Sequence, residues 1–332
     1  MTHHEHYIQR CIALAQQGEQ TAPPNPMVGA VIVHNGRIIG EGYHIRCGEA
    51  HAEVNAVRSV RPADRHLLRE STIYVSLEPC SHYGKTPPCA ELIIREGIPN
   101  VVVGCIDPFG KVKGRGIQML RKAGCNVIVG VCETECLQLN KRFITFHEKQ
   151  RPFITLKWAR TPDGYIDGLR QDASTPPLAI SNAITRTRGH RLRTLHQAIL
   201  VGHNTLLLDR PSLLPRHYAG PAPIRVVLGN LCTKEIPEGF LHYATIEEAL
   251  KDLHQRNVQS LLVEGGTKVL QSFIDRGLWD DAWEEVGTKP LLANGVKAPV
   301  ITGFAPTTTT LAGHLFHHYE QPLDLTNLRN HP

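Results

Sequence analysis

Three residues in the first half of the chain have the types and spacing of a zinc site. His51-Ala52-Glu53 comes shortly after Gly48, and eight residues separate Cys80 from Cys89. One imidazole and two thiolates form a three-ligand set for Zn²⁺ that leaves the fourth tetrahedral position to water. Two thiolates cancel the formal charge of the metal, and the bound water can lose a proton near neutral pH. We therefore expect one hydrolytic zinc ion per chain, held by His51, Cys80 and Cys89.

A carboxylate beside this zinc site is the candidate for proton transfer. Glu53 lies two residues from His51 at the start of an expected helix, where it can move protons without being a ligand. Cys89 precedes the periodic residues 92–94, so we expect it at a helix N-terminus, where the helix dipole favours the thiolate. A purely structural zinc site is the alternative interpretation, but such sites normally have four protein ligands, and three are in register here.

The elements around these residues alternate between helical and extended patterns. Residues 7–15 are apolar at helical spacing, and Asn35-Gly36 between two β-branched runs indicates a hairpin. The remaining patterns predict helices at 52–60, 90–96, 116–123 and 133–147, and strands at 72–77, 100–104 and 126–131. Such alternation predicts an α/β sheet whose faces are covered by helices.

A domain boundary is expected near residues 147–151. Pro152 cannot continue the preceding helix, and the residue before a proline is biased away from the helical region. Beyond it the strand and helix alternation restarts, with strands predicted at 153–157, 198–201, 225–228 and 260–263. A chain of this length also favours two domains. We therefore expect one domain over residues 1–147 and a second over 151–332.

Composition and charge exclude several classes of protein. The 332 residues carry a formal charge of +5, and the densest basic stretch, residues 186–193, is shorter than nucleic-acid binders usually show. No apolar run approaches the roughly 18 residues that span a bilayer, and the first residues do not resemble a secretory leader. Nine cysteines, an odd number, do not suggest a disulfide framework. We expect a cytoplasmic protein with no nucleic-acid or membrane partner.

The zinc pattern resembles the zinc nucleobase deaminases, whose signature is H-x-E followed by P-C-x-x-C. The gap of eight residues between the cysteines argues against an ordinary cytidine or tRNA-adenosine deaminase. It matches the riboflavin-pathway deaminase family, whose motif occurs here as residues 79–89, PCSHYGKTPPC. Residues 24–29, PNPMVG, and 42–44, GYH, also match that family, and the agreement spans about residues 5–145. A nucleic-acid deaminase stays a competing hypothesis, which retention on a polynucleotide column would favour.

This resemblance implies a cytidine-deaminase-like three-layer domain and a set of residues that contact the substrate. The implied contacts are Asn25, His44, His82 and Lys85. An amide and two imidazoles can hydrogen-bond the edges of a pyrimidine ring, and an ammonium group can meet a polar or anionic group. Two simpler interpretations stay open, in which Asn25 is a turn residue between prolines and Lys85 is a solvated loop residue.

Several stretches of the second half resemble the reductase domain of the bifunctional riboflavin-biosynthesis proteins, the RibD family. They are residues 156–159 (LKWA), 161–164 (TPDG), 192–193 (LR), 198–202 (AILVG), 204–205 (NT), 209–211 (DRP) and 263–266 (VEGG). The resemblance implies a dihydrofolate-reductase-like α/β fold that uses NADPH. It places Ala159, Thr205, Asp209, Gly266, Thr267 and Lys268 at the nucleotide, Arg193, Leu213, Arg216 and Glu264 at the substrate, and Asp209 and Glu264 among the catalytic residues.

The second half also departs from the family pattern at Pro162, Ala179, Arg210 and Gly229. The family implies zinc-hydroxide deamination of 2,5-diamino-6-ribosylamino-4(3H)-pyrimidinone 5′-phosphate, followed by reduction of the ribosyl group to ribityl by NADPH. A homo-oligomer is also expected. The alternative is a deaminase whose second half is structural or degenerate, in which Arg193 and Arg216 are solvated surface charges and the glycines of 265–266 serve only a strand–helix turn.

Overall fold

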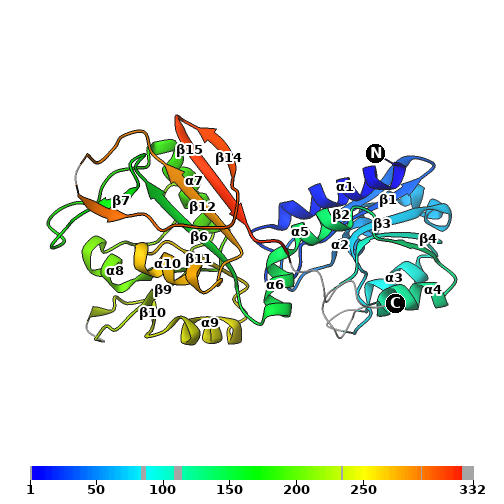
Figure 1. The fold of residues 1–332 in the computed structure, drawn as a ribbon. Coiled ribbons are helices and arrows are strands. Elements are labelled where there is room, and N and C mark those ends of the chain that lie inside the picture. The colour runs from blue at the N-terminus through cyan, green and yellow to red at the C-terminus, as the bar shows by residue number, and fades with distance from the viewer. Residues whose placement is uncertain (1, 84–86, 108–113, 233–234, 293, 324–332) are drawn as a thin grey trace. The chain divides into compact units, whose positions relative to one another are not determined.

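A computed structural model describes residues 2–83, 87–107, 114–232, 235–292 and 294–323 (Figure 1). The chain divides into two compact units, with the change between Lys149 and Gln150. Of the residues singled out in the sequence, Lys85 lies outside the described residues. No helix in the described ranges is long and apolar enough to cross a membrane.

The first unit is built on a five-stranded sheet with the order β2-β1-β3-β4-β5. Its strands are β1 (Gly29–His34), β2 (Arg37–Tyr43), β3 (Thr72–Leu77), β4 (Asn100–Cys105) and β5 (Asn126–Val129). β1 is antiparallel to β2 and β3, whereas β3, β4 and β5 are parallel. The predicted hairpin is confirmed: Asn35 and Gly36 have φ of 47° and 77°, as a two-residue turn requires.

Helices cover both faces of this sheet, which confirms the predicted three-layer arrangement (Figure 1). They are α1 (His3–Ala15), α2 (Ala52–Ser59), α3 (Cys89–Arg95), α4 (Arg115–Lys122), α5 (Glu133–Leu139) and α6 (Lys141–Lys149), with 3₁₀ turns η1 (Gln16–Gly18) and η2 (Pro62–Glu70). Side chains alternate along a strand, so Ala30 and Ile32 join the core under α2 and α3. Tyr74 faces α1 instead, where its ring centroid is 4.8 Å from that of Tyr7.

The single helix predicted for residues 133–147 is wrong, because α5 and α6 are separated at Asn140. The Asn140 side chain is buried and pairs with the backbone of Met27. It accepts from the Met27 N–H at 2.8 Å and donates to the Met27 carbonyl at 3.0 Å. An amide that satisfies a distant backbone in this way fixes the position of the break. The same contact secures the chain two residues after Asn25.

The second unit has an eight-stranded sheet with the order β10-β9-β8-β11-β6-β12-β15-β14. Its strands are β6 (Phe153–Arg160), β8 (Ala198–Gly202), β9 (Ile224–Leu228), β10 (Phe240–Tyr243), β11 (Ser260–Val263), β12 (Asp281–Val286), β14 (Thr307–Leu311) and β15 (His314–Glu320). The first six strands in sheet order are parallel to one another. β15 is antiparallel to β12, and β14 is antiparallel to β15. A separate ribbon pairs β7 (Tyr165–Gly168) with β13 (Gly295–Lys297).

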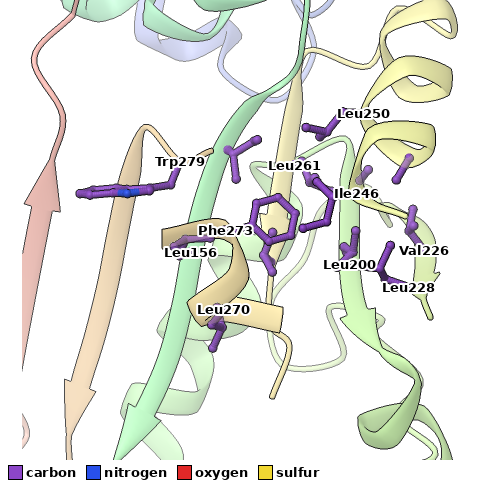
Figure 2. Close-up of a cluster of buried hydrophobic side chains, with 14 of the residues drawn as sticks. Leu156, Leu200, Val226, Leu228, Ile246, Leu250, Leu261, Leu270, Phe273 and Trp279 are labelled. Carbon is purple, nitrogen blue, oxygen red and sulfur yellow. The ribbon is translucent and has the colours of Figure 1, made fainter. Parts of the chain in front are cut away.

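Four helices pack around this sheet: α7 (Ala183–Thr194), α8 (His203–Asp209), α9 (Ile246–Gln255) and α10 (Thr267–Asp275). Figure 2 shows apolar side chains of α9 and α10, including Phe273, gathered against the sheet residues Leu200 and Leu261. Parallel strands covered in this way are continuously apolar, as in residues 198–201. Their carboxyl ends open into the loops that begin α8 and α10. The predicted α/β class is confirmed for this half as well.

Candidate active sites

The three expected zinc ligands meet in the first unit. His51 is the N-cap residue of α2, Cys80 follows the end of β3, and Cys89 is the first residue of α3. Their ligand atoms all lie within 4.8 Å of one another. His51 Nδ1 is 3.6 Å from Cys80 Sγ and 3.4 Å from Cys89 Sγ. The backbone N–H of Cys89 also donates to Cys80 Sγ at 3.2 Å, which fixes one thiol against the other.

These separations fit a tetrahedral zinc ion. With Zn–S of about 2.3 Å and Zn–N of about 2.1 Å, a nitrogen and a sulfur ligand lie about 3.6 Å apart. The donor set, one imidazole and two thiols, is one that zinc prefers. Hydrogen bonds to Cys89 and His51 lower the pKa of the Cys80 thiol, which favours the thiolate that a metal needs. The residues present therefore suit a zinc ion with an open fourth position.

Glu53 lies in the first turn of α2, close to the ligands, and is 3% exposed. Burial raises the pKa of its carboxyl group, as does the nearby Cys80, while His51 opposes the shift. A carboxyl group with a raised pKa can both accept and return a proton near neutral pH. The sequence predicted Glu53 at a helix start beside the ligands, and the structure shows it in that position.

Asn25 and His44 lie together beside the metal ligands. The Asn25 amide nitrogen is 3.1 Å from His44 Nε2, and His44 Nδ1 is 3.1 Å from the carbonyl of Ala50. Because a carbonyl can only accept, Nδ1 carries the proton and Nε2 accepts from Asn25. Burial lowers the pKa of His44, which keeps this tautomer neutral. The His44 ring is 5.5 Å from that of His51, whereas His82 is exposed.

The sequence analysis missed Glu78, which lies between β3 and the ligand Cys80. Its buried carboxylate accepts the backbone N–H groups of Asp107, Gly114, Gly116 and Ile117 at 2.9–3.4 Å. Gly116 also packs so closely on Pro79 that an added Cβ would lie 2.0 Å from the Pro79 carbonyl oxygen. Glu78 thus ties the start of α4 to the strand end that carries Cys80.

A second candidate site is a cleft of about 730 Å³ in the second unit. It opens at the carboxyl ends of β6, β8 and β11, where ligands bind in open α/β sheets. It is lined by all ten residues of the second half that the sequence assigned to the nucleotide or the substrate: Ala159, Arg193, Thr205, Asp209, Leu213, Arg216, Glu264, Gly266, Thr267 and Lys268. Because Gly266 caps the N-terminus of α10 without a side chain, that end of the cleft suits a phosphate-bearing nucleotide.

Arg193 and Glu264 form a partly buried ion pair within the cleft. Arg193 donates to the two carboxylate oxygens of Glu264 at 3.2 and 2.6 Å, and to the carbonyl of Leu214 at 3.2 Å. Burial opposes ionisation of Glu264, but Arg193 and Lys157 outweigh it and lower the pKa of the carboxyl group. Arg193 is therefore not a solvated surface charge, and its side chain is held in one geometry.

Asp209 has a partner that the sequence analysis also missed. Arg170, which follows β7, donates to Asp209 at 2.5 Å and to Asp167 at 2.7 Å, and its side chain is 6% exposed. Both Arg170 and Asp167 line the cleft. An arginine between two carboxylates fixes their orientation, so Arg170 holds Asp209 at the rim. A lone arginine in a polar loop gave no signal of this in the sequence.

The four departures from the family pattern have different positions. Ala179 lines the cleft, whereas Pro162, Arg210 and Gly229 are absent from its lining. Arg210 is exposed at the end of α8, with φ of 42°. Gly229 has φ of 129°, and an added Cβ would lie 2.3 Å from His203 Nδ1, so the local backbone itself requires glycine. None of these three residues forms part of the wall of the cleft.

Comparisons with known proteins cover both units. A family model for the cytidine and deoxycytidylate deaminase zinc-binding region matches residues 1–105, and one for the RibD C-terminal domain matches residues 152–283. Riboflavin biosynthesis protein RibD of Aquifex aeolicus is 36% identical over 308 residues, covering 83% of this chain and 84% of that protein. The Bacillus amyloliquefaciens protein of the same name is 35% identical, covering 89% and 86%.

A solved structure shows the same similarity in three dimensions. It is a diaminohydroxyphosphoribosylaminopyrimidine deaminase/5-amino-6-(5-phosphoribosylamino)uracil reductase from Thermotoga maritima, with a TM-score of 0.84 and 34% identity. The match covers 96% of this chain and 99% of that one. Sequence, domain content and fold agree over both units. This chain belongs to the RibD family of riboflavin biosynthesis proteins and contains a zinc-binding deaminase domain and a reductase domain.

Proposed function

We propose that the chain first deaminates 2,5-diamino-6-ribosylamino-4(3H)-pyrimidinone 5′-phosphate and then reduces the ribosyl group of the product to ribityl with NADPH. The observation that carries this proposal is the His51, Cys80 and Cys89 cluster with the buried Glu53 beside it. The cleft of the second unit supports the reductive half, because it gathers all the expected nucleotide and substrate residues.

In the deaminase site, His51, Cys80 and Cys89 would hold the zinc ion, which supplies a Lewis acid that lowers the pKa of water to about 7. Glu53 would accept a proton from the attacking water and pass it to a ring nitrogen. It would then accept the proton of the hydroxyl group formed on the ring carbon and pass it to the amino group, which leaves as ammonia. Asn25 meets the edge of the ring, and His44 supports Asn25. Their mutual hydrogen bond orients the amide, and the Asn140 contact with Met27 keeps the loop in place.

In the reductase site, the residues position two ligands and balance charge. The N-terminus of α10, at Gly266 to Lys268, together with Ala159, Thr205 and Asp209, would hold NADPH, which supplies the hydride when bound. Arg193 and Arg216 meet the phosphate of the substrate, and Leu213 packs beside them. Glu264, oriented by Arg193, contacts the sugar. Catalysis here depends on holding the sugar carbon against the nicotinamide.

A coupled assay tests the whole proposal on the purified full-length chain. With the diaminopyrimidine substrate, we expect ammonia release in the absence of NADPH, and NADPH oxidation only after deamination. Ammonia release without NADPH oxidation would instead favour a degenerate second half. Failure of both reactions in zinc-loaded protein would reject the proposed substrate.

The ion pair in the cleft gives a sharper test of the reductase site. Arg193→Ala should raise the reductase KM by about tenfold or more, because a charge-assisted hydrogen bond is lost and Glu264 loses its partner. Ammonia release should be unaffected. Arg191→Ala is the matched control, since Arg191 is exposed on the same helix outside the cleft. Equal KM values for the two variants would remove Arg193 from the substrate site.

The two proposed domains should also separate. We place the first domain at residues 1–147 and the second at 151–332, and the structural units change at Lys149. A fragment ending at Lys149 keeps all of α6, whose Ile144 and Phe146 are buried, so we expect it to fold, bind zinc and release ammonia without NADPH. Zinc content and ammonia release are the measurements. An insoluble or zinc-free fragment would contradict an independent first domain.

Three predictions concern the setting of the enzyme rather than its chemistry. We propose a homo-oligomer in the cytoplasm that uses no nucleic-acid partner. The basic residues are spread along the chain rather than clustered, which supports the absence of a nucleic-acid partner. Light scattering on the purified chain would measure its mass in solution, and a monomer would reject self-association.

A further inference from the structure

The reductase cleft contains a buried histidine that has no role in the reaction proposed above. His190 lies on α7, one turn before Arg193, and both line the cleft. It is 6% exposed, so only a small part of the ring is accessible. A buried polar side chain that faces a ligand cleft needs a hydrogen-bond partner there.

The hydrogen bonds of His190 determine which ring nitrogen carries the proton. The backbone N–H of His217 donates to His190 Nδ1 at 3.3 Å. A backbone N–H can only donate, so Nδ1 has no proton and the neutral ring carries its hydrogen on Nε2. Throughout the described residues, no protein group is hydrogen-bonded to this Nε2. The ring therefore presents one donor without a protein acceptor.

The charges around His190 favour an anionic ligand and keep the ring itself neutral. Burial, together with Arg193, His217 and Arg216, lowers the pKa of His190 to about 4, against the opposing effect of Glu264. The two arginines are the proposed partners of the substrate phosphate. Much of the Arg193 guanidinium is already engaged by Glu264 and Leu214. A phosphate bound there could therefore accept a hydrogen bond from a further donor.

We infer that His190 donates a hydrogen bond from Nε2 to a phosphate-ester oxygen of the reductase substrate and so helps to select a phosphorylated sugar. This inference rests on the proposed function of the second unit. It adds a neutral donor with a fixed tautomer to the two arginines. Such a donor is directional, whereas the arginines supply most of the charge.

Two amide substitutions separate this role from a structural one. In His190→Asn the side-chain amide ends near the place of Nδ1, so it can keep the bond to His217 but leaves no donor at Nε2. In His190→Gln the amide nitrogen ends near the place of Nε2 and can replace the donor. We expect H190N to raise the KM for the deaminated substrate about tenfold. H190Q should stay within about threefold of the wild type, with the KM for NADPH and ammonia release unchanged in both.

Either equal KM values for H190N and the wild type, or equal losses in H190N and H190Q, would overturn the role of His190. If the wild-type chain does not oxidise NADPH, the proposed function fails. The role of His190 can then be tested alone by calorimetry, which measures the affinity of the full chain for ribose 5-phosphate and for ribose. Weaker binding of ribose 5-phosphate to H190N, restored in H190Q and absent with ribose, supports the phosphate contact. Equal affinities in all three proteins, or the same loss with ribose, overturn it.

Discussion

Cys80→Ser and Cys89→Ser should each remove zinc and deaminase activity together. A serine hydroxyl stays protonated where the metal requires a thiolate, and each variant leaves two protein ligands. The backbone N–H of residue 89, which donates to Cys80 Sγ, is kept in Cys89→Ser, so this variant removes the thiolate ligand alone. We expect metal content, measured by atomic emission, to fall from one zinc ion per chain to near zero, with no detectable ammonia release.

Cys232→Ser is the matched control for these variants. Cys232 is exposed in the second unit, so it should keep both zinc and deamination. Far-UV circular dichroism of the fragment ending at Lys149 checks that C80S and C89S have folded. Full zinc content with full activity in both ligand variants would sink the assignment. Zinc loss with full activity would mean that the metal has no catalytic role.

The zinc cluster could be predicted from sequence because each ligand lies in a short motif that can be identified from its neighbours. Each ligand sits at the end of a strand or the start of a helix, and these ends are signalled by residues close by, as with Cys89 before an apolar helix. The two-residue spacing from His51 to Glu53 then predicts a proton-transferring carboxylate beside the metal. The nucleotide and substrate residues of the second unit followed from family motifs, which the cleft brings together.

The supporting contacts could not be predicted, because they join distant residues through groups that carry no sequence signal. Glu78 binds backbone N–H groups 29 to 39 residues away, and Asn140 binds the Met27 backbone 113 residues away. Any residue type offers a backbone N–H, so no pattern marks the partner. Arg170 and Asp209 are 39 residues apart in the sequence and meet in the lining of the cleft. The break between α5 and α6 was missed for the same reason.

Glu53→Gln should abolish deamination while zinc stays bound. Glutamine keeps the size of the side chain in its buried place but cannot accept a proton, and general acid–base groups contribute about 10²–10⁴-fold. We expect kcat for ammonia release to fall by about that factor. NADPH oxidation on supplied deaminated substrate should be unchanged. Glu49→Gln, at an exposed position four residues earlier, should be active. We expect zinc to be retained because Glu53 is not one of the proposed ligands. Zinc loss in the Gln variant would make Glu53 a ligand, and a near-normal rate would refute its role in proton transfer.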